Sequence, residues 1–245
     1  MKARSWLSAT VVAALLAPGA ASAQGIEGRF SIAFQAGTLS EISGDLMKST
    51  QGTLVGKPVT IDSKRYRDVY APDVRWQGQL AYGVSEKVEI VARGTYYKAE
   101  GTAVEAGTFD GGQLAVYFDP YGAYEEAGLE LGARYYIAST GKLKSYLGVV
   151  AGARFLSEVL ITFSAAEAGT SIQNVPFSEE GTVAVFGLDL GFTFDLGGHF
   201  FVGLDSALRY QTAPTPFEPY LELRGFNHSE GRWSAPVVAT LGVRF

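Results

Sequence analysis

Residues 184–196 read AVFGLDLGFTFDL, and this stretch decides the fold. Large apolar residues such as Phe186 and Leu188 occupy every second position. The positions between them hold small or polar residues, including Asp189 and Asp195. This period of two is typical of a β-strand with one apolar face and one polar face.

The same alternation recurs along the chain and predicts eight strands. No apolar face carries a charge, whereas the opposite faces hold thirteen charged residues. The eight segments are 30–36, 74–84, 88–96, 127–137, 147–155, 184–196, 200–210 and 237–245. The charged residues are Arg29, Arg75, Glu89, Arg93, Glu126, Glu130, Arg134, Arg154, Asp189, Asp195, Asp205, Arg209 and Arg244.

Three features favour a transmembrane β-barrel over a soluble sandwich, whose apolar faces would meet in a dry core. Aromatic residues gather near both ends of the apolar faces, as in the girdles of outer-membrane barrels. Glycines alternate with bulky charged residues on the other face, which suits a narrow filled lumen. Connections alternate between long and short, as periplasmic turns and external loops do. We therefore predict an all-β, antiparallel, up-and-down transmembrane barrel.

The strand count follows from the connections. Segments 38–73, 98–125, 156–183 and 212–236 are long, and 85–87, 138–145 and 197–199 are short. Seven connections join eight strands, an even number, so both chain termini would lie on the periplasmic side with the short turns. Residues 53–61 could form an extra hairpin, so ten strands stay open as an alternative.

The first 23 residues have the pattern of a secretory signal peptide. Lys2 and Arg4 precede an apolar core, and Ala21-Ser22-Ala23 supplies a cleavage site. We expect a signal peptide at 1–23 and a barrel domain at 24–245, exported to the cell outer membrane.

The final strand, residues 237–245, ends in an aromatic residue preceded by apolar residues at alternate positions. With the signal peptide and eight amphipathic segments, the chain resembles the small eight-stranded outer-membrane barrels of the OmpA/OmpX type, without a periplasmic domain. The resemblance implies that the barrel-assembly machinery reads Phe245, Val243 and Leu241 as an assembly signal. It also implies contact with outer-membrane lipid and lipopolysaccharide.

Composition excludes several other classes. The chain has no cysteine, which removes disulfide scaffolds, thiolate metal sites and cysteine nucleophiles. Its formal net charge of −5 gives no support for nucleic-acid binding. No residue pattern indicates a metal site or a cofactor.

The lumen charges carry the main structural hypothesis. Buried charges must pair or meet water, and eight strands leave room for little besides side chains. We expect a network that fills the lumen; a gated conduit is the alternative. Glu89 with Arg93, Glu130 with Arg134, and Asp205 with Arg209 share a face within their strands. The expected network comprises Arg29, Arg75, Glu89, Arg93, Glu130, Arg134, Arg154, Asp189, Asp205 and Arg209.

Catalysis has little support. His199 lies in a short turn, and adjacent His228 and Ser229 point to opposite sides of an extended chain. A lipid-modifying hydrolase is therefore the least favoured interpretation, and we predict no enzyme.

The long connections carry what specificity the chain shows. Lys64, Arg65 and Arg67 could dock lipopolysaccharide phosphates or an envelope protein partner. The acidic connections 98–125 and 156–183 are expected to be solvated loops. The predicted role is structural, adhesive or envelope-anchoring, with a narrow solute channel as the alternative.

Overall fold

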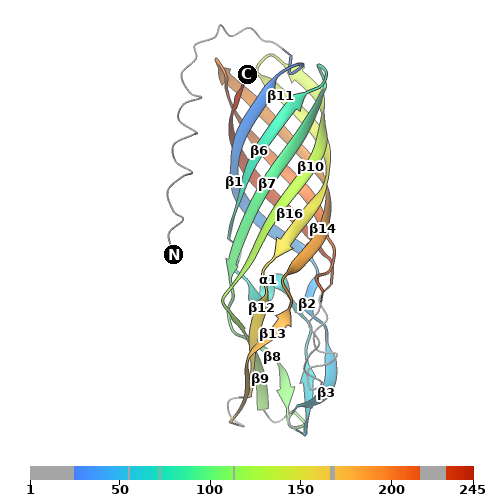
Figure 1. The fold of residues 1–245 in the computed structure, drawn as a ribbon. Helices are drawn as coiled ribbons and strands as arrows, with labels where there is room; N and C mark the ends of the chain where they lie inside the picture. Colours follow the sequence, from blue (N-terminus) through green and yellow to red (C-terminus); the bar gives the residue numbers. More distant parts are fainter. Residues whose placement is uncertain (1–24, 55, 72, 113, 166–168, 216–229) are drawn as a thin grey trace, which may run out of the picture.

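The computed structural model describes residues 25–245, apart from 55, 72, 113, 166–168 and 216–229. Eight antiparallel strands close into a barrel in the order β1-β16-β15-β14-β11-β10-β7-β6 (Figure 1). This confirms the predicted fold class and strand number. The expected signal peptide, 1–23, lies outside the described residues. The barrel strands are β1 (Phe30–Ser43), β6 (Val74–Gly83), β7 (Val88–Glu100), β10 (Ala123–Thr140), β11 (Leu143–Leu156), β14 (Gly181–Gly197), β15 (Phe200–Gln211) and β16 (Arg232–Arg244).

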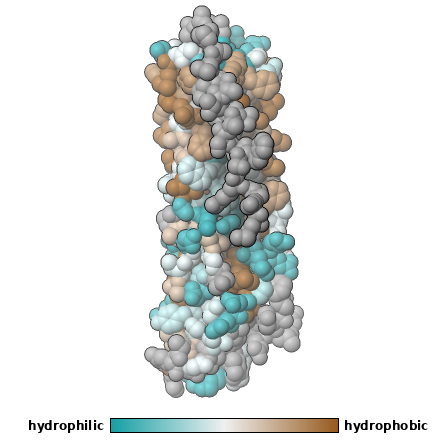
Figure 2. Space-filling view, turned by 60° about the vertical axis from the view of Figure 1, so that its left-hand side comes forward, coloured by the Kyte–Doolittle hydropathy of each residue, from teal (hydrophilic) through white to brown (hydrophobic). Residues whose placement is uncertain are grey.

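The two faces of each barrel strand separate as the alternation predicts. Leu129 and Leu131 on β10 are 62% and 67% exposed on the outer wall, whereas Glu130 between them is 1% exposed. Figure 2 shows apolar side chains gathered over the barrel half of the molecule and hydrophilic ones over the opposite half. Such an apolar outer surface is stable only against lipid.

Short turns and long connections lie at opposite ends of the barrel. The short β6–β7, β10–β11 and β14–β15 turns gather at the end that also carries the C-terminus (Figure 1). Several strands extend beyond their predicted ends, toward the long connections and, in β10 and β11, also toward the short turn that joins them. β10, for example, spans 18 residues.

Three of the long connections, 38–73, 98–125 and 156–183, are folded, which corrects the expectation that 98–125 and 156–183 are solvated loops. They build a six-stranded sheet in the order β13-β12-β9-β8-β4-β3, which extends beyond the barrel mouth (Figure 1). The hairpin expected near 53–61 exists as β3–β4, but it belongs to this sheet and adds no barrel strand. The sheet strands are β3 (Thr50–Leu54), β4 (Lys57–Ile61), β8 (Val104–Phe109), β9 (Leu114–Tyr121), β12 (Val159–Ala165) and β13 (Thr170–Ser178).

The sheet has an apolar core of its own. Phe118 on β9 is fully buried, and its ring centroid lies 5.6 Å from that of Phe163 and 5.4 Å from that of Phe177. The same core continues into the barrel mouth through Tyr97 and Tyr124. The burial of apolar side chains on one face of the sheet stabilises these segments as strands, although the other face carries charged residues.

A small unit joins the sheet to the barrel. Strands β2 (Asp45–Met47) and β5 (Lys64–Arg65) pair with each other, and helix α1 (Tyr66–Val69) follows β5. Among the described residues, no helix has the length and apolar character needed to cross a membrane.

Candidate functional site

The centre of the lumen is organised around one carboxylate, that of Glu130 on β10. Its side chain is inaccessible to solvent. Its oxygens lie 3.2 Å from Arg75 Nη2, 3.5 Å from Arg93 Nη1 and 3.3 Å from Arg209 Nη2, and Glu130 also pairs with Arg154. Four guanidinium groups from four strands therefore converge on this group.

Asp189 on β14 completes the central cluster. Its two carboxylate oxygens accept hydrogen bonds of 2.5 Å from Arg93 Nη2 and Arg209 Nη2. Arg93 also donates from Nε to Gln79 Oε1 at 3.0 Å. The two carboxylates and their arginines thus form one connected cluster across the barrel.

The network continues toward the short turns. Arg134 Nη2 lies 3.3 Å from Asp205 Oδ1, and Arg134 Nη1 lies 3.6 Å from Glu89 Oε2. The Arg134 guanidinium also stacks 4.3 Å from the ring centroid of Tyr146. At the end of the lumen, Asp195 contacts Lys144 at 2.8 Å and Arg244 at 3.4 Å.

The lumen charges that share a face within one strand have their partners on other strands. Residues four apart along a strand are separated by about 13 Å, so they do not reach each other. Arg93 pairs with Asp189 and Glu130, and Asp205 pairs with Arg134. The network is assembled across the lumen, between strands far apart in sequence.

Glycine on the lumen face makes room for this network. A Cβ at Gly187 would lie 2.5 Å from Arg209 Cδ, and a Cβ at Gly152 would overlap the carbonyl oxygen of Leu129. By contrast, the outward-facing Gly94 has no atom within 4 Å of such a Cβ. The lumen glycines therefore allow large side chains and backbone to approach closely.

At the barrel mouth, Arg232 is a member of the network that the sequence analysis missed. It donates to Glu41 Oε1 at 2.7 Å and to Tyr124 Oη at 2.9 Å, and it pairs with Glu126. Its guanidinium also lies 4.8 Å from the ring centroid of Tyr66 on α1. The signal was present in the sequence, because the period of two extended backwards from position 238 places position 232 on the lumen face.

The barrel wall has a notch at this mouth. The ladder between β1 and β6 ends at Thr38–Val74, although β1 continues to Ser43. The ladder between β6 and β7 ends at Arg75–Tyr97, although β7 continues to Glu100. Beyond the start of β6, on the side of the six-stranded sheet, the segment that contains α1 therefore lies between β1 and β7.

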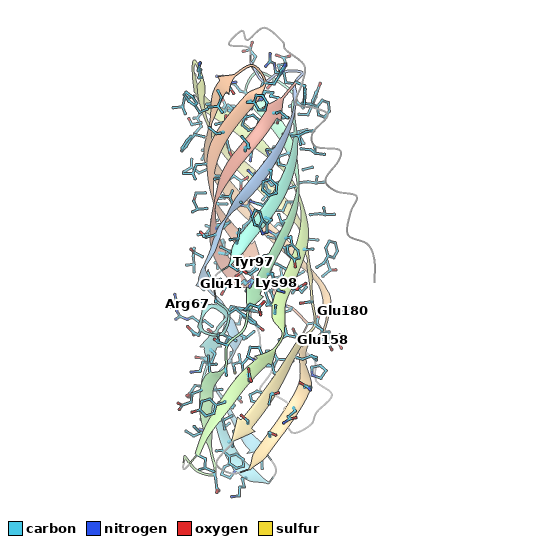
Figure 3. The ribbon with its side chains drawn as sticks, turned by 90° about the vertical axis from the view of Figure 1, so that its left-hand side faces the viewer. Glu41, Arg67, Tyr97, Lys98, Glu158 and Glu180 are labelled. Carbon is cyan, nitrogen blue, oxygen red and sulfur yellow. The ribbon has the colours of Figure 1, made fainter. Side chains whose placement is uncertain are left out.

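A pocket of about 210 Å³ occupies this notch. Figure 3 shows Glu41, Arg67, Tyr97 and Lys98 at this junction of barrel and sheet. The pocket is lined by Leu39, Ser40, Glu41, Arg67, Tyr70, Tyr97, Tyr124 and Arg232.

A closed barrel with a polar, filled interior and an apolar outer wall is suited to a lipid membrane. Aromatic rings mark both edges of the wall: Phe30 against Tyr82 near the short turns, and Tyr210 against Trp233 near the mouth. The chain has the fold of a small outer-membrane β-barrel. No family model matches the sequence, and no curated protein matches it.

Solved structures share the overall barrel. Neisserial surface protein A is 14% identical, with a TM-score of 0.47 over 91% of this chain and 100% of that one. OprG from Pseudomonas aeruginosa is 14% identical, with a TM-score of 0.45 over 91% and 98%. The outer membrane protease OmpT from Escherichia coli is 9% identical, with a TM-score of 0.37 over 91% and 98%.

The remaining predicted residues lie away from the centre of the lumen. Arg29 is half-buried immediately before β1. Lys64, Arg65 and Arg67 lie together in β5 and α1, beside the notch. His199 lies in the β14–β15 turn, where its Nδ1 is 2.7 Å from the Arg244 carbonyl oxygen.

The structure describes the residues of the expected assembly signal but not those of the possible hydrolase site. Leu241 and Phe245 are exposed on the outer wall and Val243 is half-buried there. His228 and Ser229 lie outside the described residues. Within the described part of the chain, no group of three His, Cys, Asp or Glu side chains could hold a metal ion.

Proposed function

We propose that this protein is a non-conducting, non-enzymatic outer-membrane barrel that acts as an adhesion protein through its six-stranded sheet. The observation that carries the proposal is that the connections 38–73, 98–125 and 156–183 share a buried core, centred on Phe118, instead of forming separate loops. A folded surface extension holds its side chains in fixed positions, and fixed positions lower the entropic cost of binding a partner.

The filled lumen supports the non-conducting part of the proposal. The ion pairs run from Lys144 and Asp195 at one end to Arg232 at the other. An eight-stranded barrel has space for its interior side chains and little more. The barrel is then a rigid anchor for the extension.

Placement in the cell follows the same proposal. The signal peptide would direct export, and the assembly machinery would read Phe245, Val243 and Leu241. The short turns would face the periplasm and the sheet would face the exterior. Lys64, Arg65 and Arg67 would contact lipopolysaccharide phosphates or an envelope partner.

Attachment of whole cells tests the adhesive role. We expect Gram-negative cells displaying the full chain to attach to a layer of the producing strain's own cells. A variant with residues 101–121 replaced by a short Gly-Ser turn should lose attachment, because β8 and β9 form the middle of the sheet. Its barrel should still migrate as a folded, heat-modifiable band. Equal attachment by this variant would contradict the proposal.

A narrow channel is the second candidate, since the lumen is lined by charged groups that could rearrange. Planar-bilayer recordings separate the two functions. We expect closed traces for the natural protein and for Arg93→Ala and Asp205→Ala. A marked rise in single-channel conductance in these variants would favour the channel.

A further inference from the structure

Residues 25–28, here called the N-terminal strap, lie at the end of the lumen that carries the short turns. Ile26 is 2% exposed, whereas the residues on either side of it are exposed. Its side chain forms a buried apolar cluster with Tyr136 on β10 and Tyr146 on β11. Both tyrosines are buried on the lumen face of their strands, so the strap inserts one apolar side chain into the lumen.

The two tyrosines separate Ile26 from the ion pairs of the lumen. Their ring centroids lie 5.5 Å apart, and the Tyr136 hydroxyl donates a hydrogen bond of 3.1 Å to Glu89 Oε2. The Arg134 guanidinium stacks on the Tyr146 ring and pairs with Glu89. Ile26, the tyrosine pair and the Arg134–Glu89 pair therefore follow one another from the short turns into the barrel.

The strap rests against the end of β6 at a position that only glycine can fill. A Cβ at Gly83 would lie 1.9 Å from the carbonyl oxygen of Ile26, so a larger residue there would displace the strap. The Gly28 N–H donates to the Gly83 carbonyl oxygen at 2.8 Å, and the Gly83 N–H donates to the Arg29 carbonyl oxygen at 3.0 Å. This close backbone contact fixes the point at which Ile26 enters the lumen.

The attachment of the strap is short and contains a hinge. Gly28 has a φ of 69°, in the left-handed region that glycine adopts without strain. The hold of the strap on the barrel rests mainly on the Gly28–Gly83 hydrogen bond and on the burial of Ile26. Segments with so few buried contacts open locally at a small cost in free energy.

We propose that the N-terminal strap is a releasable plug. It closes the lumen at the short-turn end when Ile26 is inserted, and it admits water to the tyrosine pair when it swings out about Gly28. The closed strap keeps the Arg134–Glu89 pair in a region of low dielectric constant, where an ion pair is stronger than in water. The inference goes beyond the adhesive role, because it concerns the end of the barrel opposite the six-stranded sheet.

Thiol accessibility tests the plug, because the natural chain has no cysteine. Ser31 on β1 is 2% exposed and pairs with Ala81, two residues further into the barrel than Gly83. The full chain carrying Ser31→Cys is placed in nanodiscs and treated with hydroxyethyl methanethiosulfonate, a small neutral thiol reagent. We expect slow modification with the strap intact. Ile26→Gly should raise the rate roughly tenfold or more, because loss of the buried side chain favours the open strap.

A second variant displaces the strap from the barrel wall. Gly83→Ala should also raise the rate, since its added methyl group would overlap the Ile26 carbonyl oxygen. Two matched controls should leave the rate unchanged. They are Glu27→Ala, at an exposed position of the strap, and Gly94→Ala, whose Cβ would meet no atom within 4 Å.

The rate for an unprotected thiol comes from Lys87→Cys, at an exposed position in the β6–β7 turn. Modification of Ser31→Cys at this rate with the strap intact would overturn the proposal. Equal rates in the Ile26→Gly and Glu27→Ala backgrounds would overturn it as well. Heat-modifiable migration verifies that each variant is folded.

Discussion

Single residues decide whether the lumen is stable, and Glu130 is the clearest case. Its carboxylate is the shared partner of Arg75, Arg93, Arg154 and Arg209 in a region without solvent access. Burying several cations is costly unless each has a counter-charge. The stability of the lumen therefore depends on this group more than on any one arginine around it.

Glu130→Gln keeps the side-chain shape and removes the charge. We expect it to lower the free energy of unfolding by about 3–5 kcal/mol, because buried guanidinium groups lose their partner. Urea unfolding in lipid vesicles, followed by tryptophan fluorescence, measures the change. Glu86→Gln, at an exposed position in the β6–β7 turn, is the control. A loss below about 1 kcal/mol, the range of ordinary surface changes, would contradict the assignment.

At the scale of secondary-structure elements, the barrel strands could be predicted from the sequence and the strands of the sheet could not. The eight barrel strands could be predicted because a membrane and a lumen impose opposite polarity on alternate residues, as at Leu129 and Glu130. The sheet could not be predicted with the same reasoning, since its strands are short and bury one face against one another. Its apolar residues, such as Phe118 and Phe163, were present, but the acidic residues between them suggested solvated loops.

Only part of the candidate site could be predicted from the alternation of residues along each strand. Alternation identifies which charges face the lumen, but it does not give their partners, which depend on the barrel's closure and register. Arg232 was missed because the last strand was expected to begin at 237, five residues too late. The notch depends on where β6 starts relative to its neighbours, and no local pattern reports that.

The sheet should unfold separately from the barrel when its core is damaged. Phe118→Ala removes a fully buried ring that contacts Phe163 and Phe177, and should destabilise the sheet by about 3–5 kcal/mol. Limited proteolysis should then cut within β8 and β9 while the barrel keeps its heat-modifiable migration. Tyr117→Ala, one residue away but 41% exposed, is the matched control. Equal protease resistance in both variants would contradict the assignment of this core.

At the scale of the whole molecule, the two ends differ in shape and in expected location. The end with the C-terminus has only short turns, and the other carries the folded extension (Figure 1). Outer-membrane barrels place short turns in the periplasm. We therefore expect the short turns to face the periplasm and the six-stranded sheet to face the exterior.

Absence of cysteine makes this orientation testable. We expect Lys57→Cys, in the sheet, to react with a membrane-impermeant maleimide on intact cells, because its side chain would face the exterior. Lys87→Cys, in the β6–β7 turn, should react only after the outer membrane is permeabilised. Both side chains are exposed, so access to the reagent is the variable. The reverse labelling pattern would invert the orientation.

The shared core of the six-stranded sheet also limits how this surface can diverge under attack by phages or antibodies. Independent loops tolerate insertions and replacements singly. Here β9 pairs with both β8 and β12, so an insertion in one strand would shift the register of its neighbours. We expect variants that escape recognition to change outward side chains such as Tyr117 and to keep strand lengths constant.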